Sequence, residues 1–152
     1  GKWVVLEWFN KDCPYVKKHY GSGNMQKLQA EYTGKGVTWL SVNSSAKGKQ
    51  GYTEAAEAVT VAKENKSAAS AVILDPSGTI GKAYGAKTTP HIFIIDPQGT
   101  TVYAGGIDDN DSSDPSVIPA SKNFAKAALD EVLAGKKVTV ATSRPYGCAV
   151  KY

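Results

Sequence analysis

The order of hydrophobic and polar positions along this chain predicts alternating strands and helices. Apolar runs and alternating β-branched or aromatic residues indicate strands over residues 3–9, 37–43, 71–75, 91–96 and 101–104. Helical spacing, capping residues and glycine stops predict helices over residues 14–32, 53–66, 80–84 and 121–134. Glycines at 21 and 23 interrupt the first helix, so we expect it to break there and restart at Asn24. This order predicts an α/β fold with a central mixed β-sheet and helices on both faces.

Turn signals separate these elements and leave a long segment after the last helix. Asp96-Pro-Gln-Gly99 is expected to close a β-hairpin. Thr53 is expected to cap its helix. Residues 108–119 are acidic and rich in turn signals, and 108–114 are expected to form a solvated loop, because they lack the glycine and glutamate of a calcium-binding EF-hand. Residues 136–152 are expected to form a C-terminal tail with a short extended piece at 138–141.

Length and composition fit one domain over residues 1–152 and narrow the classes of partner. Hydrophobic residues make up 41% of the chain, and no run approaches the ~20 apolar residues of a membrane span. The net charge of +4 comes from dispersed lysines with a single arginine, whereas nucleic-acid sites usually cluster arginine with aromatics. We therefore expect neither a membrane nor a nucleic-acid partner. The N-terminus does not resemble a signal peptide, but one could have been removed, so the cytoplasm, the periplasm and secretion all stay open.

Cys13 carries the best chemical lead, because it lies between the first strand and the first helix. Pro14 follows it directly, and proline is favoured at the first helical position. A helix N-terminus stabilises an anion and so lowers a cysteine pKa. Lys17, Lys18 and His19 follow in the same helix and would favour a thiolate if they faced the sulfur. The alternative is a buried, inert cysteine, a common state for this residue type.

Cys148, in the tail, is the only other cysteine, and its sequence context leaves three alternatives. It could resolve an oxidised Cys13, form a static disulfide with it, or have no role. Gly147 beside it supplies a flexible hinge, which favours the resolving role. The two histidines and two cysteines show no zinc-type spacing, so we expect no metal, and His19 is expected at the surface or in packing.

The element order and four short motifs resemble the thioredoxin fold, and within it a peroxiredoxin-like branch known as redoxin or thiol-specific-antioxidant domain proteins. The resemblance covers residues 3–134. The motifs are Asp12-Cys-Pro-Tyr-Val-Lys-Lys-His-Tyr20, Asn43-Ser-Ser-Ala46, Thr89-Pro-His91 and Arg144-Pro-Tyr-Gly-Cys148. Members normally carry an N-terminal β-hairpin before the first strand found here, and its absence would leave an exposed sheet edge where a dimer could pair.

The resemblance implies roles for several residues around Cys13. Pro90 would be the cis-proline that faces the reactive cysteine, and Thr89 would present backbone groups to a bound thiol or peptide. Asn10 and Arg144 are candidates for orienting substrate or stabilising an anion, together with Pro14. No prosthetic group is implied, because cysteine sulfur carries the electrons itself.

Departures from the family pattern limit what the resemblance predicts. Val16 stands where thioredoxins have their second cysteine, and Leu6 and Asn10 stand where peroxiredoxins have proline and threonine. We predict a thiol-dependent oxidoreductase that reduces peroxide or disulfide, with Cys13 as nucleophile, Cys148 as resolving thiol and a thioredoxin-like protein or glutathione as reductant. The alternatives are a non-catalytic binding or redox-sensing module and a structural Cys13–Cys148 staple.

Overall fold

Strand β1 lies at the centre of the sheet and ends at the loop that carries Cys13. The computed structural model describes residues 1–152. The strands are β1 (Val4–Trp8), β2 (Thr38–Asn43), β3 (Ala71–Leu74), β4 (Thr88–Thr89), β5 (Ile92–Ile95), β6 (Thr101–Gly105) and β7 (Cys148–Ala149). The helices are α1 (Pro14–Gly21), α2 (Asn24–Thr33), α3 (Ala55–Glu64), α4 (Thr79–Tyr84), the 3₁₀ helix η1 (Pro115–Ala120) and α5 (Phe124–Leu133).

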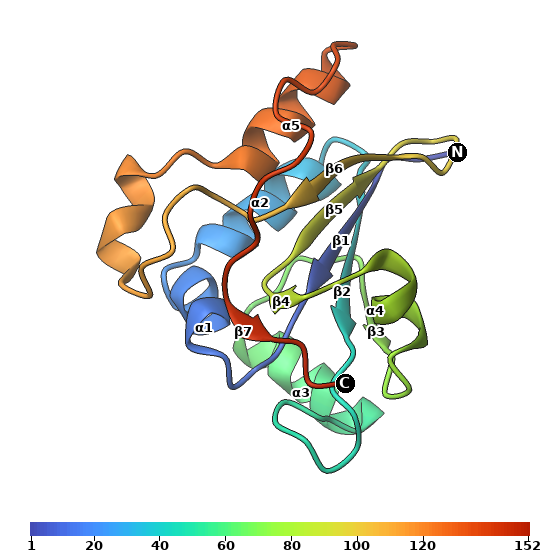
Figure 1. The fold of residues 1–152 in the computed structure, drawn as a ribbon, viewed down its shortest axis with the longest axis vertical. Coiled ribbons are helices and arrows are strands. Elements are labelled where there is room, and N and C mark those ends of the chain that lie inside the picture. Colours follow the sequence, from blue (N-terminus) through green and yellow to red (C-terminus); the bar gives the residue numbers. More distant parts are fainter.

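The main sheet has the mixed topology that the sequence predicts. Its strand order is β3-β2-β1-β5-β6, with β1 parallel to β2 and β2 parallel to β3. Strand β5 runs antiparallel to β1 and to β6, so the C-terminal pair forms the expected hairpin. Figure 1 shows this sheet in the middle of the molecule, flanked by helices. The predicted thioredoxin-type α/β architecture is confirmed.

Side chains alternate across the sheet and form two cores. Val5, Trp39 and Ile94 face the larger core, which α1, α2 and α5 cover. Leu6 and Phe93 face the smaller core, and α4 lies against that face. The predicted break in the first helix is present, because α1 ends at Gly21 and α2 starts at Asn24 after Gly23 adopts a positive φ of 80°.

The tail after α5 returns to the sheet and follows it closely. The amide of Ala104 in β6 donates to the carbonyl of Ala141 at 3.0 Å, and further along β7 pairs antiparallel with β4. Near the chain end, the Tyr152 hydroxyl donates to the carbonyl of Ala86 at 2.6 Å. In Figure 1 the tail (red) runs from α5 to a position beside β4. The tail is therefore fixed on both sides of Cys148.

Three local expectations are wrong. Glu54, and not Thr53, is the N-cap of α3, since the Thr53 hydroxyl is buried without a partner and makes no capping bond. The segment 138–141 is not a strand. The strand of the tail is β7, ten residues further on, where the tail meets β4. Asp108, expected in a solvated loop, is buried, and η1 follows this loop where the Asp114 side chain accepts from the amide of Ser116.

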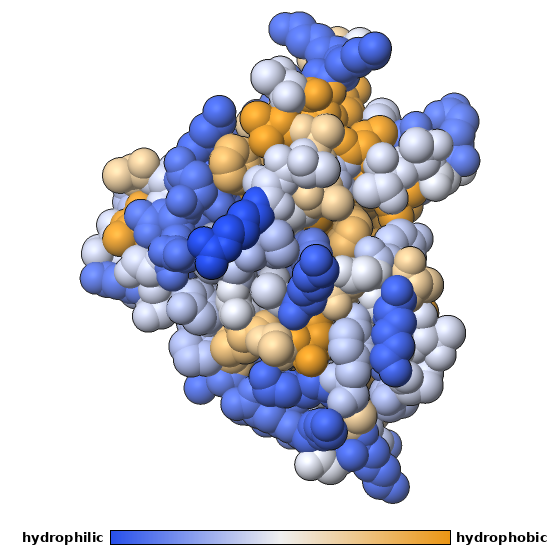
Figure 2. All heavy atoms as spheres, viewed as in Figure 1, coloured by the Kyte–Doolittle hydropathy of each residue, from blue (hydrophilic) through white to orange (hydrophobic).

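The surface is largely hydrophilic on the face drawn in Figure 2. Hydrophilic residues are spread over the face drawn in Figure 2, with smaller apolar areas between them. None of the helices combines the length and the hydropathy that crossing a bilayer requires.

Candidate active site

Cys13 is placed by the junction of β1 and α1. It is the N-cap residue of α1, with extended backbone angles (φ −78°, ψ 126°), and Pro14 occupies the first turn. The Cys13 amide donates to the carbonyl of Asn10 at 3.1 Å, and the Cys13 carbonyl accepts from the amide of Lys17 at 2.9 Å. The predicted strand-to-helix position is confirmed, and it directs the positive end of the helix dipole at this residue.

The thiol of Cys13 is fully buried and has a backbone partner from a distant part of the chain. Its exposed fraction is 0%, and its Sγ donates to the carbonyl oxygen of Thr89 at 3.2 Å. The peptide bond between Thr89 and Pro90 is cis, as predicted. Thr89 therefore faces the cysteine across the site.

Cys148 reaches the same residue from the other side. In the β4–β7 ladder Cys148 is the direct partner of Thr89, while Thr88 pairs with Ala149. Both cysteines are free thiols in the structure, and Cys148 is partly exposed whereas Cys13 is not. The two thiols thus meet at one residue, although 134 positions separate them in the sequence.

The two thiols differ in acidity. Burial raises the pKa of Cys13, but the neighbouring side chains of Cys148 and Thr89 and the backbone of Val16 and Cys148 outweigh it and hold the pKa below the ordinary value of 9.0. Burial, followed by the hydrogen bond to Cys13 and the charge of its thiolate, raises the pKa of Cys148 to about 11. Cys13 is therefore the more acidic thiol of the pair and Cys148 the less acidic one.

The other predicted site residues lie around Cys13 in different ways. The buried Asn10 side chain shapes the loop, because its Oδ1 accepts from the Asp12 amide at 2.9 Å and its Nδ2 donates to Gln50 at 3.2 Å. Pro14 is exposed at the first turn of α1. The Arg144 side chain is 84% exposed and pairs with Asp111 at 3.7 Å, so in this arrangement its charge is not among the groups that shift the pKa of Cys13.

The basic residues of α1 do not face the sulfur. None of Lys17, Lys18 and His19 is among the leading groups that shift the pKa of Cys13. His19 is fully buried, so of the two expected positions, surface or packing, it takes the packed one, and Lys18 is buried too. Both contact the hydroxyl of Tyr146, at 3.0 and 3.1 Å. They belong to a polar cluster beside the tail.

That cluster also includes a residue expected in a solvated loop. Asp108 is buried, and its Oδ1 accepts from the Tyr146 hydroxyl at 2.6 Å. Sequence reasoning missed the cluster, because its members come from α1, the segment after β6 and the tail. The one available signal was the adjacent Lys18-His19 pair in a helix that packs on the core.

A second buried cluster surrounds Glu7 in β1. The carboxylate accepts from Tyr20 at 2.5 Å, from Trp39 at 2.8 Å and from Gln29 at 3.0 Å. Burial, only partly offset by these bonds, raises the pKa of Glu7 above its ordinary value. The interpretation of residues 3–9 as an apolar strand gave no indication of this network. It connects β1 to α1, α2 and β2.

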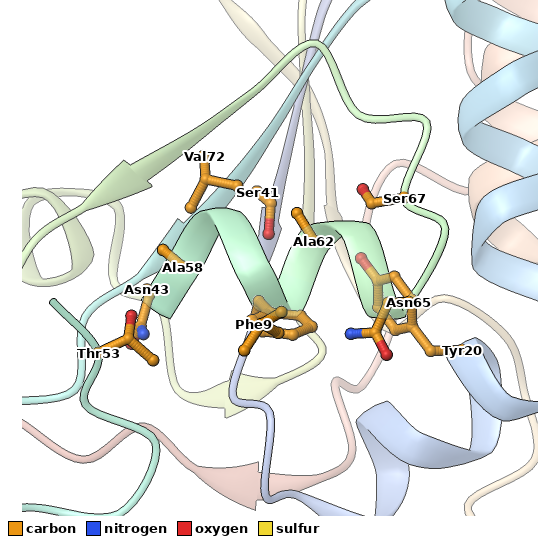
Figure 3. A pocket seen from close by; sticks show the side chains of 11 residues that line it. Phe9, Tyr20, Ser41, Asn43, Thr53, Ala58, Ala62, Asn65, Ser67 and Val72 are labelled. Atoms are coloured by element: carbon orange, nitrogen blue, oxygen red, sulfur yellow. The ribbon is translucent and has the colours of Figure 1, made fainter. Parts of the chain in front are cut away.

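A pocket between α3 and the sheet is separate from the cysteines. It is lined by Phe9, Tyr20 and Thr53 among others, and Figure 3 shows these side chains around α3. Its cavity of about 20 Å³ has room for roughly one water molecule. The pocket is too small to bind a substrate. No group of three or more metal-ligating side chains comes together in the structure.

Comparisons with solved structures agree with the fold. A hypothetical protein from Sinorhizobium meliloti 1021 superimposes with a TM-score of 0.82 at 24% identity, over 99% of this chain and 79% of that one. An uncharacterized conserved protein from Geobacillus kaustophilus gives 0.81 at 26%, over 99% and 77%. The thioredoxin domain of a thiol-disulfide oxidoreductase from Bacteroides vulgatus gives 0.51 at 23%, over 68% and 69%. No curated protein matches the chain.

The fold and the family together place the chain in the class of thioredoxin-fold thiol-disulfide oxidoreductases. The model of the AhpC/TSA family matches residues 1–104, about two thirds of the sequence. The chain belongs to the AhpC/TSA family. The matched region contains Cys13 and Thr89 but ends before the tail and Cys148.

Proposed function

We propose that Cys13 and Cys148 form an intrachain redox pair that exchanges disulfides with an external substrate. One observation carries the proposal: Thr89 accepts the hydrogen bond of the Cys13 thiol and is the ladder partner of Cys148. This arrangement gives residues 136–152 a part in the active site. It also supplies within one chain the second thiol that the motif Cys-Pro-Tyr-Val lacks.

The reaction follows from the difference in acidity between the two thiols. The Cys13 thiolate attacks a substrate disulfide RS–SR′, which forms a Cys13–SR mixed disulfide and releases R′S⁻. The Cys148 thiol loses its proton and attacks the Cys13 sulfur, which forms the Cys13–Cys148 disulfide and releases RS⁻. Two thiols from a thioredoxin-like protein or from glutathione then reduce the pair and become a disulfide themselves.

Burial indicates where the oxidised pair meets its reductant. Cys148 is partly exposed and Cys13 is not, so an incoming thiolate has access to the Cys148 sulfur first. Attack there expels Cys13 as the leaving group, and a thiolate of lower pKa leaves faster. For the same reason, a substrate disulfide reaches the buried Cys13 only when β7 separates from β4.

Peroxide is the second candidate substrate, and family membership favours it. Cys13 thiolate would attack ROOH, release ROH and become a sulfenic acid, and Cys148 would condense with it to a disulfide and water. The surroundings of the sulfur favour disulfide exchange instead. Asn10 is engaged with Asp12 and Gln50, and Arg144 would have to leave Asp111 to reach the thiolate.

A turnover assay tests the proposal. The chain is supplied with a dithiol reductant and either oxidised glutathione or hydrogen peroxide, and the wild type is compared with Cys13→Ser and Cys148→Ser. We expect catalysis by the wild type and background rates for Cys13→Ser. Cys148→Ser should be slower than the wild type with oxidised glutathione, because Cys13 stays in a mixed disulfide until the external dithiol reduces it. Background rates for all three proteins with both substrates would refute the proposal and favour a non-catalytic binding module.

A further inference from the structure

Tyr146 lies two residues before Cys148, and its hydroxyl is the centre of the buried polar cluster. It donates to Asp108 Oδ1 at 2.6 Å and accepts from Lys18 Nζ at 3.1 Å. The third contact, with His19 Nε2 at 3.0 Å, is also one in which the hydroxyl accepts. Asn24 Nδ2 lies 2.9 Å from His19 Nδ1 and must donate to it, which places the histidine proton on Nε2. The hydroxyl thus uses its one proton and both lone pairs.

The cluster ties this point of the tail to the helix that starts at Cys13. Lys18 and His19 lie in α1, whose N-cap is Cys13. Tyr15, in the first turn of α1, packs edge-on against the Tyr146 ring at 5.7 Å between centroids. Tyr146 is therefore held along the length of one short helix, so its position is fixed relative to the nucleophile.

The partners of the hydroxyl have few alternatives to it. Lys18, His19 and Asp108 are exposed by only 3%, 0% and 2%, and buried polar groups without partners are costly. Besides Tyr146, the ammonium group of Lys18 has one other hydrogen-bond acceptor, the carbonyl of Asn110 at 2.9 Å. The cluster is thus a set of desolvated polar groups arranged around a single hydroxyl of the tail.

Gly147 converts this anchor into a position for Cys148. Its φ of 143° turns the chain, and a Cβ at this residue would fall on the carbonyl group of Thr89. The tail can therefore pass directly from the Tyr146 anchor to the ladder that pairs Cys148 with Thr89.

From this geometry we infer that Tyr146 is a positioning residue for the Cys13–Cys148 pair. Its hydroxyl latches the tail to α1 through Lys18, His19 and Asp108, and this latch sets the effective concentration of the Cys148 thiol at Cys13. The inference rests on the proposed function, because it assigns the residue that makes the exchange between the two cysteines efficient.

The test compares Tyr146→Phe with Tyr152→Phe. Both variants delete one phenolic hydroxyl that anchors the tail, on opposite sides of Cys148, and Tyr152 bonds only the Ala86 carbonyl. Each full-length protein is equilibrated in glutathione redox buffers, and the fraction of Cys13–Cys148 disulfide is measured by thiol alkylation and mass spectrometry. We expect Tyr146→Phe to lower the equilibrium constant for disulfide formation by about tenfold or more, since bonds to charged groups are lost. Tyr152→Phe should change it by less than about threefold.

A second measurement guards against a simple folding defect. Circular dichroism confirms that each variant is folded, and Lys18→Met provides a variant that keeps the tyrosine. It should shift the equilibrium in the same direction as Tyr146→Phe but by a smaller factor, because two of the three contacts remain.

The outcomes distinguish a failure of the positioning role of Tyr146 from a failure of the proposed redox pair. Equal equilibrium constants for wild type and Tyr146→Phe, or equal losses in Tyr146→Phe and Tyr152→Phe, overturn the positioning role and leave the redox pair intact. A wild-type chain that forms no intrachain disulfide in any buffer overturns the proposed function, and the positioning role with it.

Discussion

The two cysteines of this chain lie at one site but are placed there in different ways. Cys13 is positioned by neighbours in sequence: a buried strand, a polar turn and a helix that starts at Pro14. Cys148 belongs to a tail with a two-residue strand, and its position depends on contacts with α1, β4 and the segment after α4. The first region is local in origin and the second is assembled from distant elements.

The difference has a chemical counterpart. The junction that buries Cys13 also gives it the helix N-terminus and the backbone of Val16, which lowers its pKa together with the side chains of Cys148 and Thr89. The tail brings Cys148 to the same place as a thiol with a pKa of about 11. The position of the nucleophile Cys13 is therefore set by the β1–α1 junction, while the reactivity of Cys148 depends on how firmly the tail is held.

The largest expected effect comes from a substitution that removes the turn beside Cys148. In Gly147→Ala the new methyl group would overlap the Thr89 carbonyl and require an unfavourable φ of 143°, so β7 should leave β4. We expect disulfide turnover to fall by roughly 100-fold while the thermal unfolding of the sheet changes little. The measurement is the turnover assay with a dithiol reductant, paired with a melting curve.

Gly135→Ala is the matched control. Gly135 also has a positive φ, of 75°, but a Cβ there meets nothing within 4 Å. It should cost about 1 kcal/mol of stability without loss of turnover. Similar losses of turnover in both variants would show that the contact with Thr89 is not what places Cys148.

A second test uses acid to loosen the anchor of the tail. Burial, only partly offset by Asp108 and reinforced by Lys18, lowers the pKa of His19 to about 4, against an unfolded value near 6.5. Between these values the unfolded chain binds more protons, so stability falls as the pH decreases through this window. We expect a loss of about 2 kcal/mol in the free energy of unfolding between about pH 7 and about pH 5 from this residue alone.

His91 provides the comparison within the same chain, because burial lowers its pKa to about 4 as well. Denaturant unfolding of His19→Gln and His91→Gln at both pH values separates the two contributions. Each variant should lose part of the acid sensitivity, and only the first should change the Cys13–Cys148 equilibrium. An acid response of the wild type that neither substitution reduces would contradict this account.

The smallest predicted effect concerns the influence of the tail on the nucleophile. The Cys148 side chain is among the groups that lower the pKa of Cys13. In Cys148→Ala we expect the pKa of Cys13 to rise toward the ordinary thiol value. A titration of thiolate absorbance in the ultraviolet measures it, and an unchanged or lower pKa would show that helix and backbone alone set the acidity.

The contrast between the regions also explains what the sequence could predict. Cys13, Pro14 and the cis peptide at Pro90 were predictable, because strand, turn and helix signals are local and the motif resembles a known fold. The tail strand and the burial of Asp108 were not, since they depend on which distant side chains meet. The adjacent Lys18 and His19 do not indicate from sequence that Tyr146, 127 residues beyond His19, accepts a hydrogen bond from the histidine ring.

Two further features could not be predicted from the sequence for the same reason. Glu7 is buried in an otherwise apolar strand, and the hydrogen bonds that Tyr20, Trp39 and Gln29 donate to its carboxylate offset the cost of that burial. Arg144 is beside Cys148 in the sequence, yet its exposed side chain turns to Asp111. Proximity in sequence indicated the right segment but not the direction of the side chain.

The most direct test of the central claim is a peptide map of the oxidised protein. The full-length chain is oxidised mildly at low concentration, alkylated, digested without reduction and analysed by mass spectrometry. The account predicts one dominant linkage, between the peptides that contain Cys13 and Cys148, in protein that remains monomeric on a non-reducing gel. Oxidised protein in which Cys13 is linked only to small thiols or to a second chain, with Cys148 free, would contradict it.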